Sequence, residues 1–146
     1  MKEYERKQLL ERLDRAGSTV GVEIPERVTV QGEPVDLREF VFEIKRMESV
    51  PPGERERVEA AKSNLRRERL QRRQRIEDDE VNYEEAEEIV ESILGIDRAL
   101  NALESLGPTD LEAEARRQEV ADRKRWMSFL KQVLGHDDGP DRRAGP

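Results

Sequence analysis

The chain lacks cysteine, is poor in aromatic side chains and contains no long apolar run. None of its 146 residues is Cys, and only one Trp, two Tyr and three Phe are present. Without cysteine, a disulfide framework and a thiolate metal site are both excluded. No apolar run approaches the roughly 18 residues that span a bilayer, and the first residues lack the apolar segment of a secretion signal. We therefore expect a cytoplasmic protein that does not enter a membrane.

Large apolar side chains are scarce as well. Leu, Ile, Val and Phe supply 34 of the 146 residues, roughly 23%, which is only a little above the content at which chains fail to fold. A chain of this length supports one ordinary domain. We expect a single helical domain over residues 1–135 with a thin core. Residues 136–146 carry no large apolar side chain, so we expect them to be a disordered tail.

The apolar residues that are present recur mostly at helical spacing. We expect two shorter helices within residues 1–50 and three long helices within residues 54–135. Proline and glycine at 50–53 and at 107–108 end the helices that precede them. Capping boxes predict three of the helix starts: Asp36 with Glu39, Asn82 with Glu85, and Thr109 with Glu112.

Residues 20–35 follow a strand pattern instead. Val20, Val22 and Ile24 alternate with other residues, as do Val28 and Val30, and a turn follows at 31–33. This predicts a small β-hairpin or a three-stranded meander, which needs support from helices because so short a sheet is unstable alone. The expected fold class is mainly α: an antiparallel bundle of three long helices with two shorter N-terminal helices and a small β-hairpin.

Charge is segregated along the chain. The net charge is −7, yet residues 55–75 hold nine basic and three acidic residues. This stretch therefore carries about +6, which leaves about −13 for the rest of the chain. An acidic body with one basic helix indicates either an anionic partner or a helix that is neutralised by its own acidic neighbours.

Four basic residues of this stretch line one face of the expected helix. Lys62, Arg66, Arg69 and Arg73 are spaced by four, three and four residues. Arginines set along a rigid helix could bind successive phosphates, although no aromatic residue interleaves with them for base stacking. Three interpretations stay open. In the first, the face is solvated or is paired with the acidic start of the next helix, Glu84 to Glu91. In the second it binds nucleic acid or ribosomal RNA, and in the third it binds an acidic protein.

Other features give weaker signals. The carboxylates within 78–85 lack the alternating ligands and central glycine of a calcium loop, so no metal site is expected. His136 is the only histidine, and it lies in the tail without a partner for acid–base, zinc or triad chemistry. The glycines at 17–21 lack the lysine and spacing of a phosphate loop. Trp126 and Phe129 are expected in the core, although a helix near the chain end could also dock on a partner.

The kind of charge is also informative. The chain has 34 acidic residues, and its 27 basic residues are 21 arginines and only 6 lysines. High acidity with scarce lysine keeps a protein hydrated at molar salt, which indicates a salt-loving organism, although a mesophilic coiled-coil-like protein can also be highly charged.

Four segments resemble an uncharacterised protein family of halophilic archaea. They are REFVFEIKR at 38–46, NLRRERL at 64–70, GIDRALNAL at 95–103 and DRKRW at 122–126. The resemblance extends over nearly the whole chain up to residue 134. It implies a haloarchaeal origin and supports the salt argument, and it transfers no activity, substrate or functional residue.

The sequence thus predicts a small non-enzymatic helical protein that binds a macromolecular partner. The expected contact is the face of Lys62, Arg66, Arg69 and Arg73, and no catalytic residue, cofactor or metal ligand is predicted. The alternative is an RNA- or DNA-binding, ribosome-associated protein. A third reading, an enzyme, would require a concave pocket with convergent polar groups that the linear sequence does not display. The class of partner stays open, and the weak core leaves a homodimer as compatible with the sequence as a monomer.

The fold should depend on salt, because the acidic body repels itself at low ionic strength. We expect helix content and melting temperature to rise between about 0.1 M and molar potassium chloride, where the Debye length shrinks to about 3 Å. Circular dichroism at increasing salt measures both. A flat response would contradict the halophilic interpretation.

Overall fold

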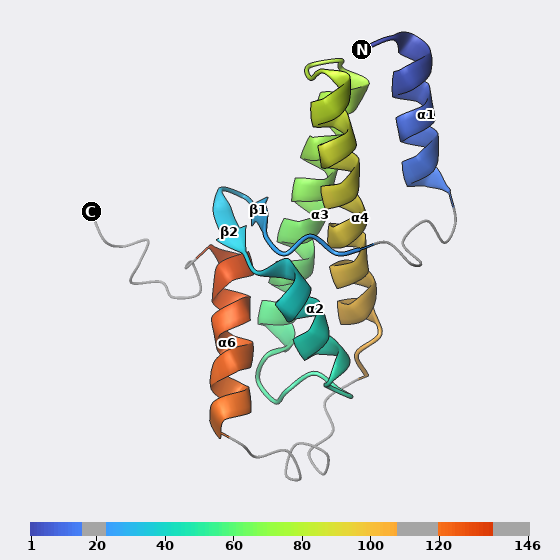
Figure 1. Cartoon of the computed structure of the whole chain (residues 1–146). Helices are drawn as coiled ribbons and strands as arrows, with labels where there is room; N and C mark the ends of the chain where they lie inside the picture. The colour runs from blue at the N-terminus through green and yellow to red at the C-terminus, as the bar shows by residue number, and fades with distance from the viewer. Residues whose placement is uncertain (16–22, 108–119, 136–146) are drawn as a thin grey trace, which may run out of the picture.

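The computed structural model describes residues 1–15, 23–107 and 120–135 of the chain. These residues form five helices and a two-stranded sheet (Figure 1). In chain order the elements are α1 (Glu3–Asp14), β1 (Val28–Val30), β2 (Glu33–Val35), α2 (Leu37–Lys45), α3 (Arg55–Glu77), α4 (Tyr83–Glu104) and α6 (Val120–Leu134). The mainly helical fold class with a small hairpin is confirmed. None of the described helices is long and apolar enough to cross a bilayer.

The two longest helices, α3 and α4, form a helical hairpin around which the other elements pack (Figure 1). The predicted capping box opens α4: Asn82 Oδ1 accepts a hydrogen bond from the Glu85 N–H at 2.8 Å, and Glu85 Oε1 accepts one from the Asn82 N–H at 3.2 Å. On α3 the buried residues form only a narrow seam: Val58, Ala61, Leu65 and Ile76. Most of the α3 surface is therefore left to charged side chains.

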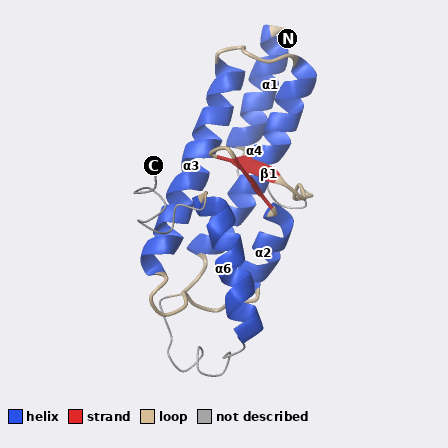
Figure 2. Ribbon diagram, turned by 90° about the vertical axis from the view of Figure 1, so that its left-hand side faces the viewer, coloured by secondary structure: helices blue, strands red, loops and turns tan. Residues whose placement is uncertain are grey.

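The core divides into two clusters along this hairpin. Near the turn between α3 and α4, α1 packs on both helices and buries Leu9 against residues such as Ile76 and Leu94. Toward the other end, α2 packs on α4, and α6 packs on α3 and the sheet. Figure 2 shows α1 at one end of the hairpin and α2 with α6 at the other. A chain with few apolar residues thus supplies two small cores in place of one large one.

The larger cluster contains the aromatic residues of α6. Trp126 and Phe129 are buried, and their ring centroids lie 6.1 and 5.9 Å from that of Phe40 on α2. The core assignment of these two residues is confirmed. Beside them the buried carboxylate of Glu43 accepts a hydrogen bond from Arg125 Nε at 2.5 Å, which ties α2 to α6.

The sheet is a tight antiparallel hairpin. Val28 pairs with Val35 and Val30 with Glu33. The two turn residues, Gln31 and Gly32, both have positive φ angles, of 49° and 87°, as a two-residue hairpin turn of the right twist requires. Within the described residues no third strand joins this pair. Val20 and Val22, which suggested one, lie outside those residues.

One predicted helix cap is wrong. Asp36 precedes α2, but its side chain makes no capping hydrogen bond. Its carboxylate instead accepts hydrogen bonds from Arg27 Nε at 2.9 Å and Gln132 Nε2 at 3.0 Å. Arg27 directly precedes β1 and Gln132 lies on α6, so the packing of these two elements brings the donors to Asp36. The other capping box expected at residues 109–112, the phosphate-loop candidate at 17–21 and the tail at 136–146 lie outside the described residues.

Gly95 should be irreplaceable despite its position inside α4. A Cβ atom there would lie 2.7 Å from Pro25 Cδ and 3.1 Å from Leu37 Cδ2. Alanine in place of glycine gains up to about 1 kcal/mol of helix propensity, whereas forcing an extra carbon into a packed core costs about 1–3 kcal/mol. The closed Pro25 ring cannot rotate away, so we expect Gly95→Ala to destabilise the fold.

Thermal unfolding followed by circular dichroism measures this effect. The melting temperature of Gly95→Ala should fall by roughly 3–10 °C. Ser63→Ala, at an exposed position of α3, serves as the helical control and should be neutral or slightly stabilising. An unchanged or higher melting temperature for Gly95→Ala would refute the proposed clash.

Candidate interaction site

The predicted basic face lies on α3 beside its buried seam. Three of its residues, Arg66, Arg69 and Arg73, line a cavity of about 420 Å³ between α1, α3 and α4. We call this cavity the arginine cleft. Its other lining residues are two aspartates and three apolar side chains: Leu13, Asp14, Leu70, Ile93 and Asp97. Lys62 lies one helical turn before Arg66 and is not part of the lining.

Two arginines of the cleft are held by aspartates of other helices. Arg69 Nη1 donates to Asp97 Oδ1 of α4 at 2.7 Å. Arg73 binds Asp14 at the end of α1 through two hydrogen bonds of 2.7 and 3.1 Å, and its Nε donates to Glu77 at 3.2 Å. Two parallel hydrogen bonds to one carboxylate make the strongest arrangement available to an arginine pair. The cleft is therefore partly neutralised from within.

The other two residues of the predicted face differ from each other. Lys62 is largely covered and pairs with Glu59 on its own helix at 2.9 Å. Arg66 is exposed and makes neither a hydrogen bond nor an ion pair with any described residue. Its positive charge acts on Glu59 only at longer range. Of the four predicted residues, Arg66 alone could bind a partner without first breaking an ion pair with a described residue.

One of the open interpretations paired the basic face with the acidic start of α4, and the structure shows other partners. In the part of the chain that the structure describes, no ion pair joins the basic face to Glu84 to Glu91. Because α3 and α4 run antiparallel from a turn at 78–82, the start of α4 lies beside the end of α3. Arg69 consequently faces Asp97, in the second half of α4. Asp14 comes from a helix whose docking site the sequence does not show.

A further ion pair on α3 connects this helix to α4 and to the β-hairpin. Glu68 and Arg72 bind each other at 2.7 Å with side chains only 13% and 17% exposed. Arg72 also donates to Ser92 Oγ of α4 at 3.0 Å and to the Thr29 carbonyl of the hairpin at 2.8 Å. The sequence indicated the pair through its spacing of four residues, but not the contacts beyond α3. Arg72 is a structural residue rather than a binding one.

The ion pairs shift the pKa values of their members. A hydrogen bond from Arg73 is the main cause that lowers the pKa of Asp14, and the same bond raises the pKa of Arg73. A hydrogen bond from Lys62 likewise lowers the pKa of Glu59. Both carboxylates are thus charged in their pairs at neutral pH.

The described residues contain no cluster of acidic or histidine side chains that could hold a metal ion. In particular, the carboxylates within 78–85 do not converge. His136 lies outside the described residues. The arginine cleft therefore offers guanidinium groups, carboxylates already in pairs, and apolar surface, which together suit binding of a charged partner.

Comparison with known proteins identifies a family without an assigned role. Residues 1–131 match a family model described as a family of unknown function, DUF5788. No curated protein and no solved structure matches the chain.

The lowered pKa of Asp14 should depend on Arg73. Above its usual pKa, Asp14 is charged and its pair helps to hold α1 on α3. The contribution of this pair to the stability of the fold is lost as the pH falls through the lowered pKa that Asp14 has in the folded state. In Arg73→Gln, we expect the pKa of Asp14 to rise toward the usual value of about 3.9.

Titration of the Asp14 carboxyl by NMR measures this shift. Arg67→Gln is the matched control, because Arg67 is exposed and does not line the cleft. That variant should leave the pKa of Asp14 as it is in the unmodified protein. Equal values of this pKa in all three proteins would show that the Asp14–Arg73 pair does not form in solution.

Proposed function

Because the chain belongs to DUF5788, a family of unknown function, we propose its role from its own surface. It is a small non-enzymatic protein that docks an acidic segment of a partner protein in the arginine cleft. One observation carries this proposal: an exposed leucine and an arginine that pairs with no described residue lie side by side in the cleft. Leu70 is 55% exposed, and Arg66 precedes it by one helical turn.

Exposed aliphatic surface next to arginine is typical of protein interfaces. Contiguous apolar surface on a soluble protein marks interaction sites, and interfaces are enriched in arginine while other charged residues are depleted. In the cleft, Leu70 is accompanied by the partly exposed Leu13 of α1, and the buried Ile93 of α4 lies at the base. A partner with one apolar side chain would cover the two leucines and leave its carboxylates facing the arginines.

The partner's carboxylates have two places to bind. The first is Arg66, which has no partner to give up in the described part of the chain. The second is Arg73, where an incoming carboxylate would replace Asp14, whose side chain is 62% exposed. Exposed ion pairs contribute only about 0–1 kcal/mol, so the exchange costs little. Asp97 is only 20% exposed, so its contact with Arg69 would remain as the floor of the site.

Nucleic acid is the second candidate, and the charge of the cleft argues against it. Three arginines and two aspartates leave the cleft with about one net positive charge, whereas nucleic-acid affinity depends on neutralising several phosphates. Three other exposed arginines of α3 have no hydrogen bond or ion pair with described residues: Arg55, Arg67 and Arg75. By their spacing Arg67 and Arg75 lie off the line of the cleft arginines, and Arg55 lies about three helical turns before Arg66, outside the cleft. A sugar–phosphate backbone also offers no aliphatic surface to cover Leu70.

We place this activity in the cytoplasm of a salt-loving archaeon. The acidic, lysine-poor composition supports the salt assignment. At molar salt, long-range charge attraction is screened within about 3 Å. A contact that combines apolar burial with close guanidinium–carboxylate pairs keeps more of its affinity there than a purely electrostatic one.

A pull-down at molar potassium chloride tests the proposal. The bait is the full chain, compared with the double variant Arg66→Glu and Leu70→Ser, and the captured protein and RNA are both identified. We expect a defined set of proteins that survives RNase treatment. Its recovery should fall at least tenfold with the double variant, because loss of a hot-spot residue at the centre of an interface costs about 2 kcal/mol or more.

The control is Arg67→Glu, which changes the same charge on the same helix outside the cleft. It should leave recovery of those proteins unchanged, and circular dichroism should show all three proteins folded. Capture that is insensitive to the cleft variant, or that disappears with RNase, would contradict binding of an acidic protein at this site.

A further inference from the structure

One aromatic side chain of α2 is left uncovered by the rest of the described chain. Phe42 is 59% exposed, whereas Phe40, Val41 and Ile44 of the same helix are buried. Figure 1 shows α2 on the outside of the hairpin that α3 and α4 form. A single exposed apolar residue is ordinary on a soluble protein, so the significance of Phe42 depends on the side chains around it.

Two side chains of opposite charge flank Phe42 on one edge of the helix. Glu39 is three residues before Phe42, and Arg46 is four residues after it and keeps helical backbone angles. At about 100° per residue, both lie on the same side of the Phe42 side chain. Both are exposed, and their side chains form no hydrogen bond or ion pair with the described part of the chain. We call these three residues the α2 face.

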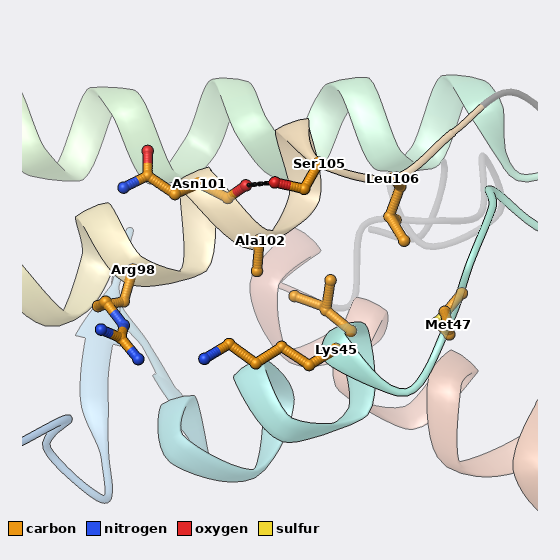
Figure 3. A pocket seen from close by; sticks show the side chains of 8 residues that line it. Lys45, Met47, Arg98, Asn101, Ala102, Ser105 and Leu106 are labelled. Atoms are coloured by element: carbon orange, nitrogen blue, oxygen red, sulfur yellow. Dashed lines mark hydrogen bonds between the residues drawn. The ribbon is translucent and has the colours of Figure 1, made fainter. Parts of the chain in front are cut away.

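The cations on the other edge of α2 are directed toward the rest of the chain. Arg38 donates to the Ile24 carbonyl at 2.9 Å and to Glu23 at 3.4 Å, so that Glu23 offsets its charge. Lys45 lines the groove between α2 and α4, and in Figure 3 its side chain runs along α2 toward Arg98 of α4. The α2 face is therefore the part of this helix that is left for a partner.

The α2 face is complementary to itself. When two antiparallel helices are related by a two-fold axis at Phe42, residues before Phe42 in one copy face residues after it in the other. Along the helix, Glu39 lies about 4.5 Å before Phe42 and Arg46 about 6 Å after it. Glu39 of each copy thus comes beside Arg46 of the other. An acidic protein or a nucleic acid would instead leave Glu39 next to a like charge.

We propose that the chain forms a symmetric homodimer through the α2 face. The two Phe42 rings meet at the two-fold axis, where their contact adds to the burial of apolar surface. The two Glu39–Arg46 pairs between the copies select the antiparallel direction. This interface is independent of the arginine cleft, whose lining contains no residue of α2.

The size of the helix sets the strength of the dimer. α2 has nine residues, and one such helix covers less than the roughly 800 Å² per partner of a standard stable interface. We therefore expect a weak dimer, with a dissociation constant of roughly 10–1,000 µM.

Sedimentation equilibrium of the full chain at molar potassium chloride tests the dimer. Between protein concentrations of about 10 µM and 1 mM, the mean mass should rise from that of one chain toward that of two. Phe42→Gln should weaken dimerisation at least tenfold, because it removes the residue at the centre of the interface. Since Phe42 is largely exposed, this variant should remain folded, as circular dichroism checks.

Charge variants test the pairing itself. Glu39→Arg and Arg46→Glu each place like charges opposite one another in the dimer and should each weaken it at least threefold. An equimolar mixture of the two variants restores opposite charges at both contacts, so the mixed dimer should be tighter than the dimer of either variant alone. Arg67→Glu, at an exposed position of α3, is the control for a change of net charge and should leave the dimer unchanged.

A mean mass that stays at one chain over the whole concentration range would overturn the proposal. So would a mixture of the two charge variants that associates no more tightly than its components. If the unmodified chain stays monomeric and Phe42→Gln instead loses a captured protein or RNA in the pull-down, the α2 face binds that molecule and not a second copy. None of these results bears on the arginine cleft, since Arg66 and Leu70 are intact in every variant.

Discussion

The ion pair between Glu68 and Arg72 connects α3 to both the hairpin and α4. Glu68 accepts hydrogen bonds from both the backbone N–H and the side chain of Gln31, at 2.8 and 3.1 Å. Arg72 donates to Thr29 in the hairpin and to Ser92 on α4. Loss of one member of a largely buried pair is expensive, because it leaves the other charge without a partner. This pair adds to the buried valines in holding the hairpin on α3, and α6 packs in turn on β2.

This reliance on polar contacts follows from the composition. The described apolar residues form two clusters, one around α1 and one around α2 and α6. Between them, charged residues of α3 reach neighbouring helices: Arg69 binds Asp97 and Arg73 binds Asp14. The arginine-rich stretch thus stabilises the fold as well as providing a surface, which leaves Arg66 as the uncommitted member of the predicted face.

The arginine cleft offsets most of its positive charge within the chain. Aspartates of other helices pair with two of its three arginines, and exposed Leu70 adds apolar surface. This arrangement suits a partner that brings both carboxylates and an apolar side chain.

The amino-acid sequence alone determined which segments form helices and where several of them end. Helical periodicity and the Asn82 capping box depend on residues three or four apart, so α3 and α4 could be predicted closely. Spacing also placed Lys62, Arg66, Arg69 and Arg73 on one face. Only the tertiary structure decided what that face meets, because Asp14 and Asp97 come from helices 59 and 28 residues away in the chain. Such pairs depend on how helices dock, and docking is decided by packing over the whole domain rather than by any local pattern.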